Sequence, residues 1–161
     1  MVRPARPEDA EAIARVHVET WRAAYAHALP AETLARVDVA ERARLWKGWL
    51  AGESATFVGE SDGVVRGFVG VGRSREEPGI GELYTIYVLP EAWGTGLGDA
   101  LIERGERELR DRGFAEAMLS VLADNPRAER FYERHGWHRA DTYRGEFLGQ
   151  PVELAHHRKR L

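Results

Sequence analysis

The sequence of 161 residues contains no cysteine, and this absence excludes several kinds of chemistry. The chain can form neither a disulfide framework nor a thiolate metal site, and it cannot use a covalent cysteine mechanism. No uncharged run is long enough to span a bilayer, and the segment Met1–Asp9 lacks the apolar core of a signal peptide. The sequence therefore predicts a cytoplasmic protein with no membrane partner.

An excess of positive charge is also missing. The formal net charge of −3 argues against a nucleic-acid partner, which needs a basic face, and the basic run His156–Arg160 is too short to change this. The hydrophobic content of 43% and the charged content of 30% are ordinary for a soluble globular protein. The length is that of one domain, residues 1–161.

The chain alternates between helical and extended patterns. Apolar residues at three- and four-residue spacing predict a helix from near Pro7 to about Ala28 and a second helical region from Pro30 to Gly52. Two further helices are expected, one after Gly96 that ends at Gly113 and one from Asn125 to Gly136. The expected strands are Met1–Ala5, Ala55–Glu60, Val64–Val71, Ile80–Leu89, Phe114–Leu122, Trp137–Tyr143 and Val152–Arg158.

A glycine-rich turn, Pro90–Leu101, lies where a strand gives way to a helix. Gly94, Gly96 and Gly98 would bring free backbone N–H groups and the positive end of a helix dipole around one small concavity. Such a turn suits a phosphate or pyrophosphate. The alternative is that the glycines only let the chain turn sharply.

Two common phosphate motifs do not match this turn. A dinucleotide fingerprint needs GxGxxG or GxGxxA and an acidic residue about twenty positions further on, where this sequence has Met118. A P-loop needs a lysine directly after its last glycine, and neither Lys47 nor Lys159 follows one. Hydrolysis of a nucleoside triphosphate is therefore not expected.

A third pattern does match. The strand Leu83–Pro90 followed by Trp93–Gly98 resembles the acyl-CoA signature Q/R-x-x-G-x-G/A of the GNAT superfamily of N-acyltransferases, with Trp93 in place of glutamine or arginine. The segment Asn125–Trp137 is similar to the block N-x-x-A-x-x-x-Y-E-x-x-G-F of the same family, with tryptophan at its last position. Two blocks in the right order are more specific than either alone, and the element order of the whole chain is also that of the family.

The resemblance implies an α+β fold with a mixed, mostly antiparallel sheet of about seven strands flanked by about four helices. Strand four would bulge and splay from strand five, which leaves a slot for CoA. The implied donor is acetyl-CoA, with its pantetheine arm along strand four and its pyrophosphate in the turn. The implied cofactor-binding residues are Ile86, Tyr87, Val88, Gly94, Thr95, Gly96, Leu97, Gly98, Asp99 and Asn125.

Transfer to an amine needs a proton acceptor and a proton donor. An alkylamine has a pKa of about 10, so a base must remove its proton before attack. The resemblance places Tyr132 beside the donor sulfur, where a phenol of pKa about 10 can protonate a leaving thiolate of about 8.5. The alternative for Tyr132 is a core tyrosine on the inner face of its helix.

Glu82 is the preferred base, because a carboxylate within an apolar strand is seldom buried without a role. The alternative is that strand alternation turns it to solvent. Ser120 stands where some relatives carry a glutamate, and His17 and His138 are further candidates. His135 and His138 do not make a convincing metal pair, so no metal is expected.

The acceptor would enter beside the first two helices and the turn before the last strand. Aromatic side chains there could bind an apolar or cationic group, and an arginine could bind a carboxylate, although most such aromatics belong to a core. The candidate acceptor-binding residues are Trp21, Arg22, Tyr25, Trp46 and Tyr143.

Together these features predict an acetyl-CoA-dependent N-acetyltransferase, which moves the acetyl group to a primary amine of a small molecule or peptide through a tetrahedral intermediate. The alternative is a CoA-binding sensor or regulatory domain with little or no transferase activity. A homodimer is a common arrangement in similar proteins. The letters do not choose among amino acid, polyamine, antibiotic and protein N-terminus as the acceptor.

Overall fold

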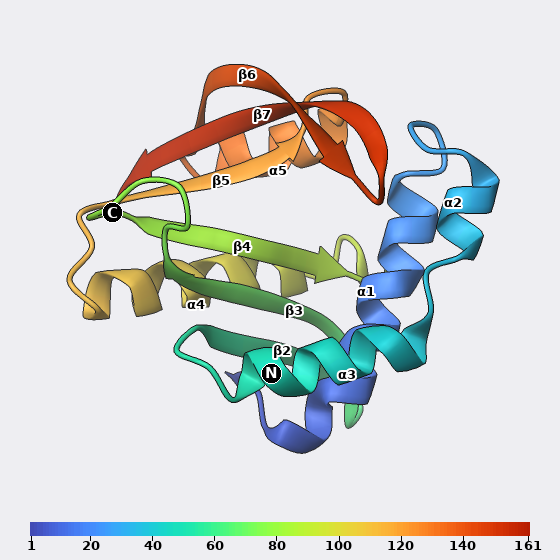
Figure 1. The fold of residues 1–161 in the computed structure, drawn as a ribbon. Coiled ribbons are helices and arrows are strands. Elements are labelled where there is room, and N and C mark those ends of the chain that lie inside the picture. Colours follow the sequence, from blue (N-terminus) through green and yellow to red (C-terminus); the bar gives the residue numbers. More distant parts are fainter.

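A computed structural model describes all residues, 1–161, as one seven-stranded sheet with helices on both faces (Figure 1). The strand order is β1-β2-β3-β4-β5-β7-β6, and every neighbouring pair is antiparallel except β4 and β5. The strands are β1 (Val2–Pro4), β2 (Ala55–Ser61), β3 (Val64–Arg73), β4 (Gly81–Val88), β5 (Glu116–Leu122), β6 (His138–Phe147) and β7 (Gln150–Arg160).

Five α-helices accompany the sheet, with short 3₁₀ turns at Pro7–Asp9 and Pro90–Ala92. None of these helices combines the length and the apolar character needed to cross a membrane. The helices are α1 (Ala10–Ala24), α2 (Ala31–Ala35), α3 (Val39–Leu50), α4 (Leu97–Asp111) and α5 (Pro126–Arg134).

The N-terminal helices differ in two respects from the sequence prediction. The first helix ends at Ala24 rather than near Ala28, and the expected second helix is divided into α2 and α3. The division occurs because Asp38 caps a new helix, its carboxylate accepting a hydrogen bond from the Ala40 N–H at 3.0 Å. The helix count is therefore five rather than about four.

The two faces of the sheet carry separate hydrophobic cores. Helices α1 and α3 pack on one face, around Ile13, Trp46 and Phe68. Helix α4 packs on the other, and Gly105 lets it approach closely, since a Cβ there would lie 3.0 Å from the side chain of Val71.

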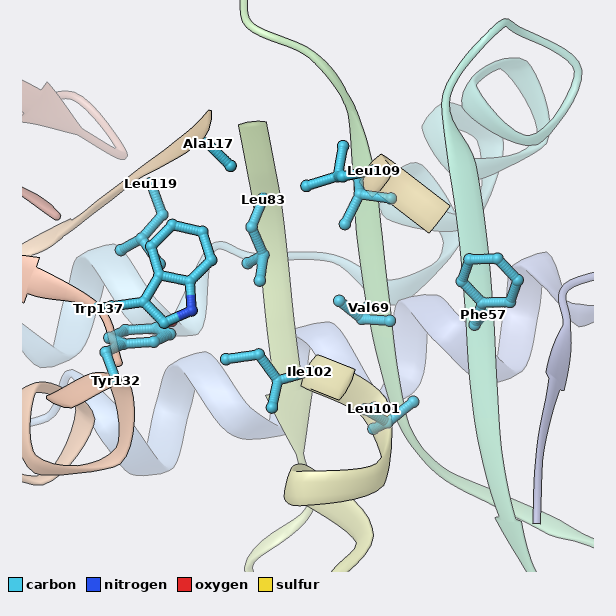
Figure 2. Close-up of a cluster of buried hydrophobic side chains, with 11 residues drawn as sticks. Phe57, Val69, Leu83, Leu101, Ile102, Leu109, Ala117, Leu119, Tyr132 and Trp137 are labelled. Atoms are coloured by element: carbon cyan, nitrogen blue, oxygen red, sulfur yellow. The ribbon is translucent and has the colours of Figure 1, made fainter. Parts of the chain in front are cut away.

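The second core extends from α4 to the start of β6 (Figure 2). Tyr132 and Trp137 lie next to each other there, with Leu119 of β5 beside them. Trp137 is fully buried, and its indole N–H donates to the buried carboxylate of Glu106 at 2.9 Å. These contacts fix the C-terminal end of α5 against the sheet.

Strands β4 and β5 begin together and then separate, as Figure 1 shows. Their parallel pairing is limited to Gly81 with Ala117 and Glu82 with Met118. On its other edge β4 contains a bulge, because Gly70 pairs with Thr85 and Val71 with Leu83, which leaves Tyr84 without a partner. The predicted bulged and splayed strand four is confirmed.

Candidate active site between strands β4 and β5

A cavity of about 540 Å³ fills the space that opens where the two strands separate. Its walls come from β4, β5, the glycine-rich turn, α5 and the end of α1. One end lies at the turn and α5, and we call it the donor end. The other lies at Thr20, Ala24 and Tyr25 of α1, and we call it the acceptor end.

The glycine-rich turn forms the floor of the donor end. Gly94 has φ +75° and Gly96 has φ +86°, conformations that favour glycine. A Cβ at either position would meet nothing within 4 Å, so these glycines serve the backbone conformation and also leave open space beside the N-terminus of α4. The turn therefore has the shape of an anion cradle.

The other residues predicted in the turn are placed differently. Gly98 and Asp99 line the cavity, whereas Thr95 and Leu97 do not. The Thr95 hydroxyl donates to the Ala92 carbonyl at 2.6 Å and so closes the turn. The Leu97 side chain packs against Gly59 of β2 and belongs to the core.

Asp99 brings a negative charge close to the cradle, and two basic side chains offset it. Its carboxylate is 2.7 Å from His135 Nε2 and accepts a hydrogen bond from Arg134 at 2.6 Å. These hydrogen bonds, that of His135 first, lower the pKa of Asp99 below its usual value. The carboxylate is thus engaged with α5 rather than free to repel an anion.

The edge of β4 that faces β5 has no strand partner beyond Glu82. Ile86, Tyr87 and Val88 all line the cavity along this stretch. Backbone groups on such an edge can pair with an extended amide-containing chain in the manner of an added strand. Asn125 also lines the cavity and caps α5, its side chain accepting from the Ala128 N–H at 3.2 Å.

Tyr132 of α5 lines the cavity. It is 8% exposed, and no residue of the chain is hydrogen-bonded to its hydroxyl. Burial raises the pKa of Tyr132, so the phenol keeps its proton at physiological pH. The structure therefore brings this predicted residue into the cavity as a protonated hydroxyl.

Glu82 is only 2% exposed, so the alternative in which it faces solvent is wrong. It does not line the cavity, however. Its carboxylate accepts hydrogen bonds from the backbone N–H of Arg75 at 2.9 Å and from the Arg75 guanidinium at 2.6 Å. The structure does not bring Glu82 and Tyr132 together in one cavity wall.

At the acceptor end the polar groups are hydroxyls. Tyr25 lies there as predicted, and its hydroxyl is 3.4 Å from that of Tyr87. Burial raises the pKa of both phenols, so both are neutral at physiological pH. Thr85 also lines the cavity, and its buried hydroxyl has no partner in the chain.

Four residues predicted at the acceptor end do not line the cavity. Arg22 is occupied, because its guanidinium donates to the carbonyls of Leu34 and Val37. Tyr143 is close by, and its hydroxyl donates at 3.0 Å to Ser120, which does line the cavity. The remaining two, Trp21 and Trp46, are buried in the cores around α1.

His17 explains why Trp46 is held away from the cavity. The Trp46 indole N–H donates to His17 Nδ1 at 3.1 Å, and the imidazole stacks on Tyr87 with ring centroids 5.1 Å apart. Burial lowers the pKa of His17 to about 3, so this histidine is neutral and packs as a core residue. His138 is exposed on β6 and lies outside the cavity.

Sequence reasoning missed several residues of the donor end. Arg127 and Arg130 of α5 line the cavity, and so does Trp93 of the turn. The Arg127 guanidinium lies over the Trp93 indole, 3.1 Å from the ring centroid. The one feature of the sequence that could have indicated this pair was Trp93, which stands where the acyl-CoA signature has glutamine or arginine.

Comparison with known proteins agrees with this geometry. The sequence profile described as the acetyltransferase (GNAT) family matches residues 11–137. The chain belongs to this family. The expected family, fold class and class of enzyme are thereby confirmed.

Among its relatives is the uncharacterized N-acetyltransferase YuaI of Bacillus subtilis, 37% identical over 128 residues, which cover 78% of this chain and 73% of YuaI. The mycothiol acetyltransferase of Paenarthrobacter aurescens is 36% identical over 123 residues, 74% of this chain but only 38% of that protein. This GNAT chain therefore corresponds to about two fifths of the mycothiol acetyltransferase.

A solved GNAT structure, that of yncA, a putative acetyltransferase from Salmonella typhimurium with its cofactor acetyl-CoA, has the same fold, with a TM-score of 0.76 at 22% identity. The alignment covers 99% of this chain and 92% of yncA. The expected donor, acetyl-CoA, is thus the one found in a protein of this fold.

Proposed function

We propose that this protein transfers an acetyl group from acetyl-CoA to a primary amine of a small molecule or peptide. One observation carries the proposal: a single cavity is lined by the glycine cradle, by the hydroxyl-bearing residues near the end of α1 and by Tyr132. A donor in the cradle and an acceptor at the other end would meet beside this phenol.

The residues at the donor end fit acetyl-CoA. Gly94 and Gly96 leave the cradle open for a pyrophosphate, and Asn125 stands beside it. The unpaired edge of β4 at Ile86–Val88 suits the amides of the pantetheine arm. When bound, acetyl-CoA supplies the thioester that is attacked.

The proposed site offers a group for each step of the transfer. A backbone N–H near Val88 would stabilise the oxyanion that forms as the amine nitrogen bonds to the carbonyl carbon. Tyr132 would donate its proton as the carbon–sulfur bond breaks, so the thiolate leaves as a thiol. Burial raises the pKa of Tyr132, so the phenol carries the proton that the leaving thiolate takes up.

Glu82 is proposed to take the amine proton through water, because its carboxylate lies behind the cavity wall and is held by Arg75. Glu82→Gln should flatten the acidic limb of the pH profile of kcat/KM. Glu77→Gln is the matched control, since Glu77 lies in the loop between β3 and β4 that also carries Arg75 but pairs with Arg158 at 2.7 Å. An unchanged limb in Glu82→Gln would assign the base to water or another residue.

The proposal is tested by following release of free CoA from acetyl-CoA with a panel of amines: an amino acid, a polyamine, an aminoglycoside and a peptide with a free N-terminus. We expect one class to accelerate release well above hydrolysis. Calorimetry with CoA on the same sample separates the alternative, because a sensor domain would bind CoA and release none with any amine. No binding at millimolar CoA would contradict both readings.

A further inference from the structure

The glycine-rich turn that is proposed to hold the phosphates of acetyl-CoA contains no basic side chain. No lysine or arginine lies between Pro90 and Gly98, and the only charged side chain there is Glu91, which pairs with Arg66 at 3.0 Å. Asp99 follows and is also acidic. Backbone N–H groups alone would therefore face a doubly charged pyrophosphate, unless a cation comes from another element.

Arg127 reaches the turn from α5. Its guanidinium lies 3.1 Å from the centroid of the Trp93 indole and lines the cavity. The indole is fixed in turn, because its N–H donates to the Val88 carbonyl at 2.8 Å. A planar guanidinium stacked on a fixed aromatic face is held in position beside the cradle before any ligand binds.

Arg127 differs from the other arginines whose ionisation is perturbed. Carboxylate partners raise the pKa of Arg3, Arg75 and Arg158. Burial alone lowers the pKa of Arg127, and no carboxylate is within ion-pair distance of it. Its charge is therefore unmatched within the chain, which leaves the guanidinium available to pair with an anion.

The neighbouring basic residues are less suited to this role. Arg134 is bound to Asp99 at 2.6 Å, and its charge is therefore already matched. Arg130 also lines the cavity, but its guanidinium is not stacked on an aromatic ring of the turn as that of Arg127 is. Arg127 alone among the three combines an unmatched charge with a fixed place over the turn.

We infer that Arg127, held over Trp93, is the residue that binds the phosphate groups of CoA and makes donor affinity depend on them. The inference rests on the proposed use of CoA. Trp93 thus contributes indirectly: it occupies the position of a polar or basic residue in the signature and positions a cation that α5 supplies. The two residues act as one unit beside the glycine cradle.

Calorimetry with CoA, 3′-dephospho-CoA and pantetheine tests this inference on the full chain. Arg127→Ala should lower the affinity for CoA about tenfold or more and leave the affinity for pantetheine unchanged. A loss that persists with dephospho-CoA assigns the contact to the pyrophosphate, and a loss confined to CoA assigns it to the 3′-phosphate. Arg107→Ala, an exposed arginine on α4, is the control for net charge and should bind CoA like the wild type.

Trp93→Leu tests the stacking. It should lower CoA affinity by itself, and the double variant with Arg127→Ala should lose little more than Arg127→Ala alone. Wild-type affinity for CoA in Arg127→Ala, or an equal loss for pantetheine, would overturn the inference. Failure of the wild type to bind CoA would instead overturn the proposed function. Thermal unfolding of each variant confirms that the binding data come from folded protein.

Discussion

The donor and acceptor ends of the cavity are lined by different chemical groups. The donor end consists of backbone N–H groups, two left-handed glycines and arginines of α5. The acceptor end consists of neutral hydroxyls and aromatic rings, among them Tyr25 and Tyr87, backed by a histidine whose burial keeps it uncharged. The first end suits a charged ligand of fixed structure, and the second suits selection of a ligand by shape and hydrogen bonding.

This difference predicts that substitutions at the two ends affect separate quantities. Changes at the donor end should alter the affinity for CoA, whereas changes at the acceptor end should alter the KM for the amine. Residues buried behind either end should alter stability alone.

The largest effect is expected at the cradle. Gly96→Val forces a β-branched residue into φ +86°, and it should lower CoA affinity about 100-fold, because the N–H groups of the turn lose their common direction. Gly79→Val is the control, since Gly79 has φ +89° in the loop between β3 and β4. Both variants should lose about 1–2 kcal/mol of stability. Equal loss of CoA affinity in the two would contradict the assignment of the cradle.

A stability effect is expected behind the acceptor end. The pKa of His17 is about 3 in the folded protein and about 6.5 when unfolded, so falling pH protonates the unfolded chain first. Stability should therefore fall from pH 6.5 towards pH 3, by about 2 kcal/mol at pH 5, with no such dependence above pH 6.5. Urea unfolding should show the full loss in the wild type and in His138→Gln, and a smaller loss in His17→Phe, where His157, whose pKa burial also lowers, still contributes. A loss in His17→Phe as large as that in the wild type would show that His17 is not the group responsible.

The smallest effect is expected at the acceptor end itself. Tyr25→Phe removes a hydroxyl that lines the cavity, and it should raise the amine KM about fivefold while CoA affinity stays the same. Trp46→Phe should leave both values unchanged and lower stability by about 1–3 kcal/mol, because it breaks the hydrogen bond to His17. A rise in KM with Trp46→Phe would place that residue in the acceptor pocket after all.

The main-chain structure of the donor end could be predicted because it depends on residues that are close together in the sequence. Glycine spacing fixes the turn, and Asn125 followed by Pro126 fixes the start of α5, where the Asn125 side chain caps the helix. Neither feature depends on distant contacts. The location of Tyr132 in the cavity follows from the same helix.

The acceptor end was predicted less well because it depends on tertiary packing. Helical periodicity places Trp21 and Trp46 on buried faces, but it cannot tell a core from a cavity wall. Nothing in the sequence indicates that Arg22 has a partner, but in the fold its guanidinium donates to backbone carbonyls. Arg127 was missed because an exposed arginine at a helix start has no pattern that links it to a turn about thirty residues away.

The central claim is that donor and acceptor meet at Tyr132, and steady-state kinetics of Tyr132→Phe test it most directly, with calorimetry of CoA on the same protein. The phenyl ring preserves the packing against Trp137 and Leu119 shown in Figure 2 and removes only the proton donor. The account predicts that kcat falls about 100-fold while the Kd for CoA stays within about twofold of the wild-type value. A kcat equal to that of the wild type, or an equal loss in kcat and CoA affinity, would contradict it.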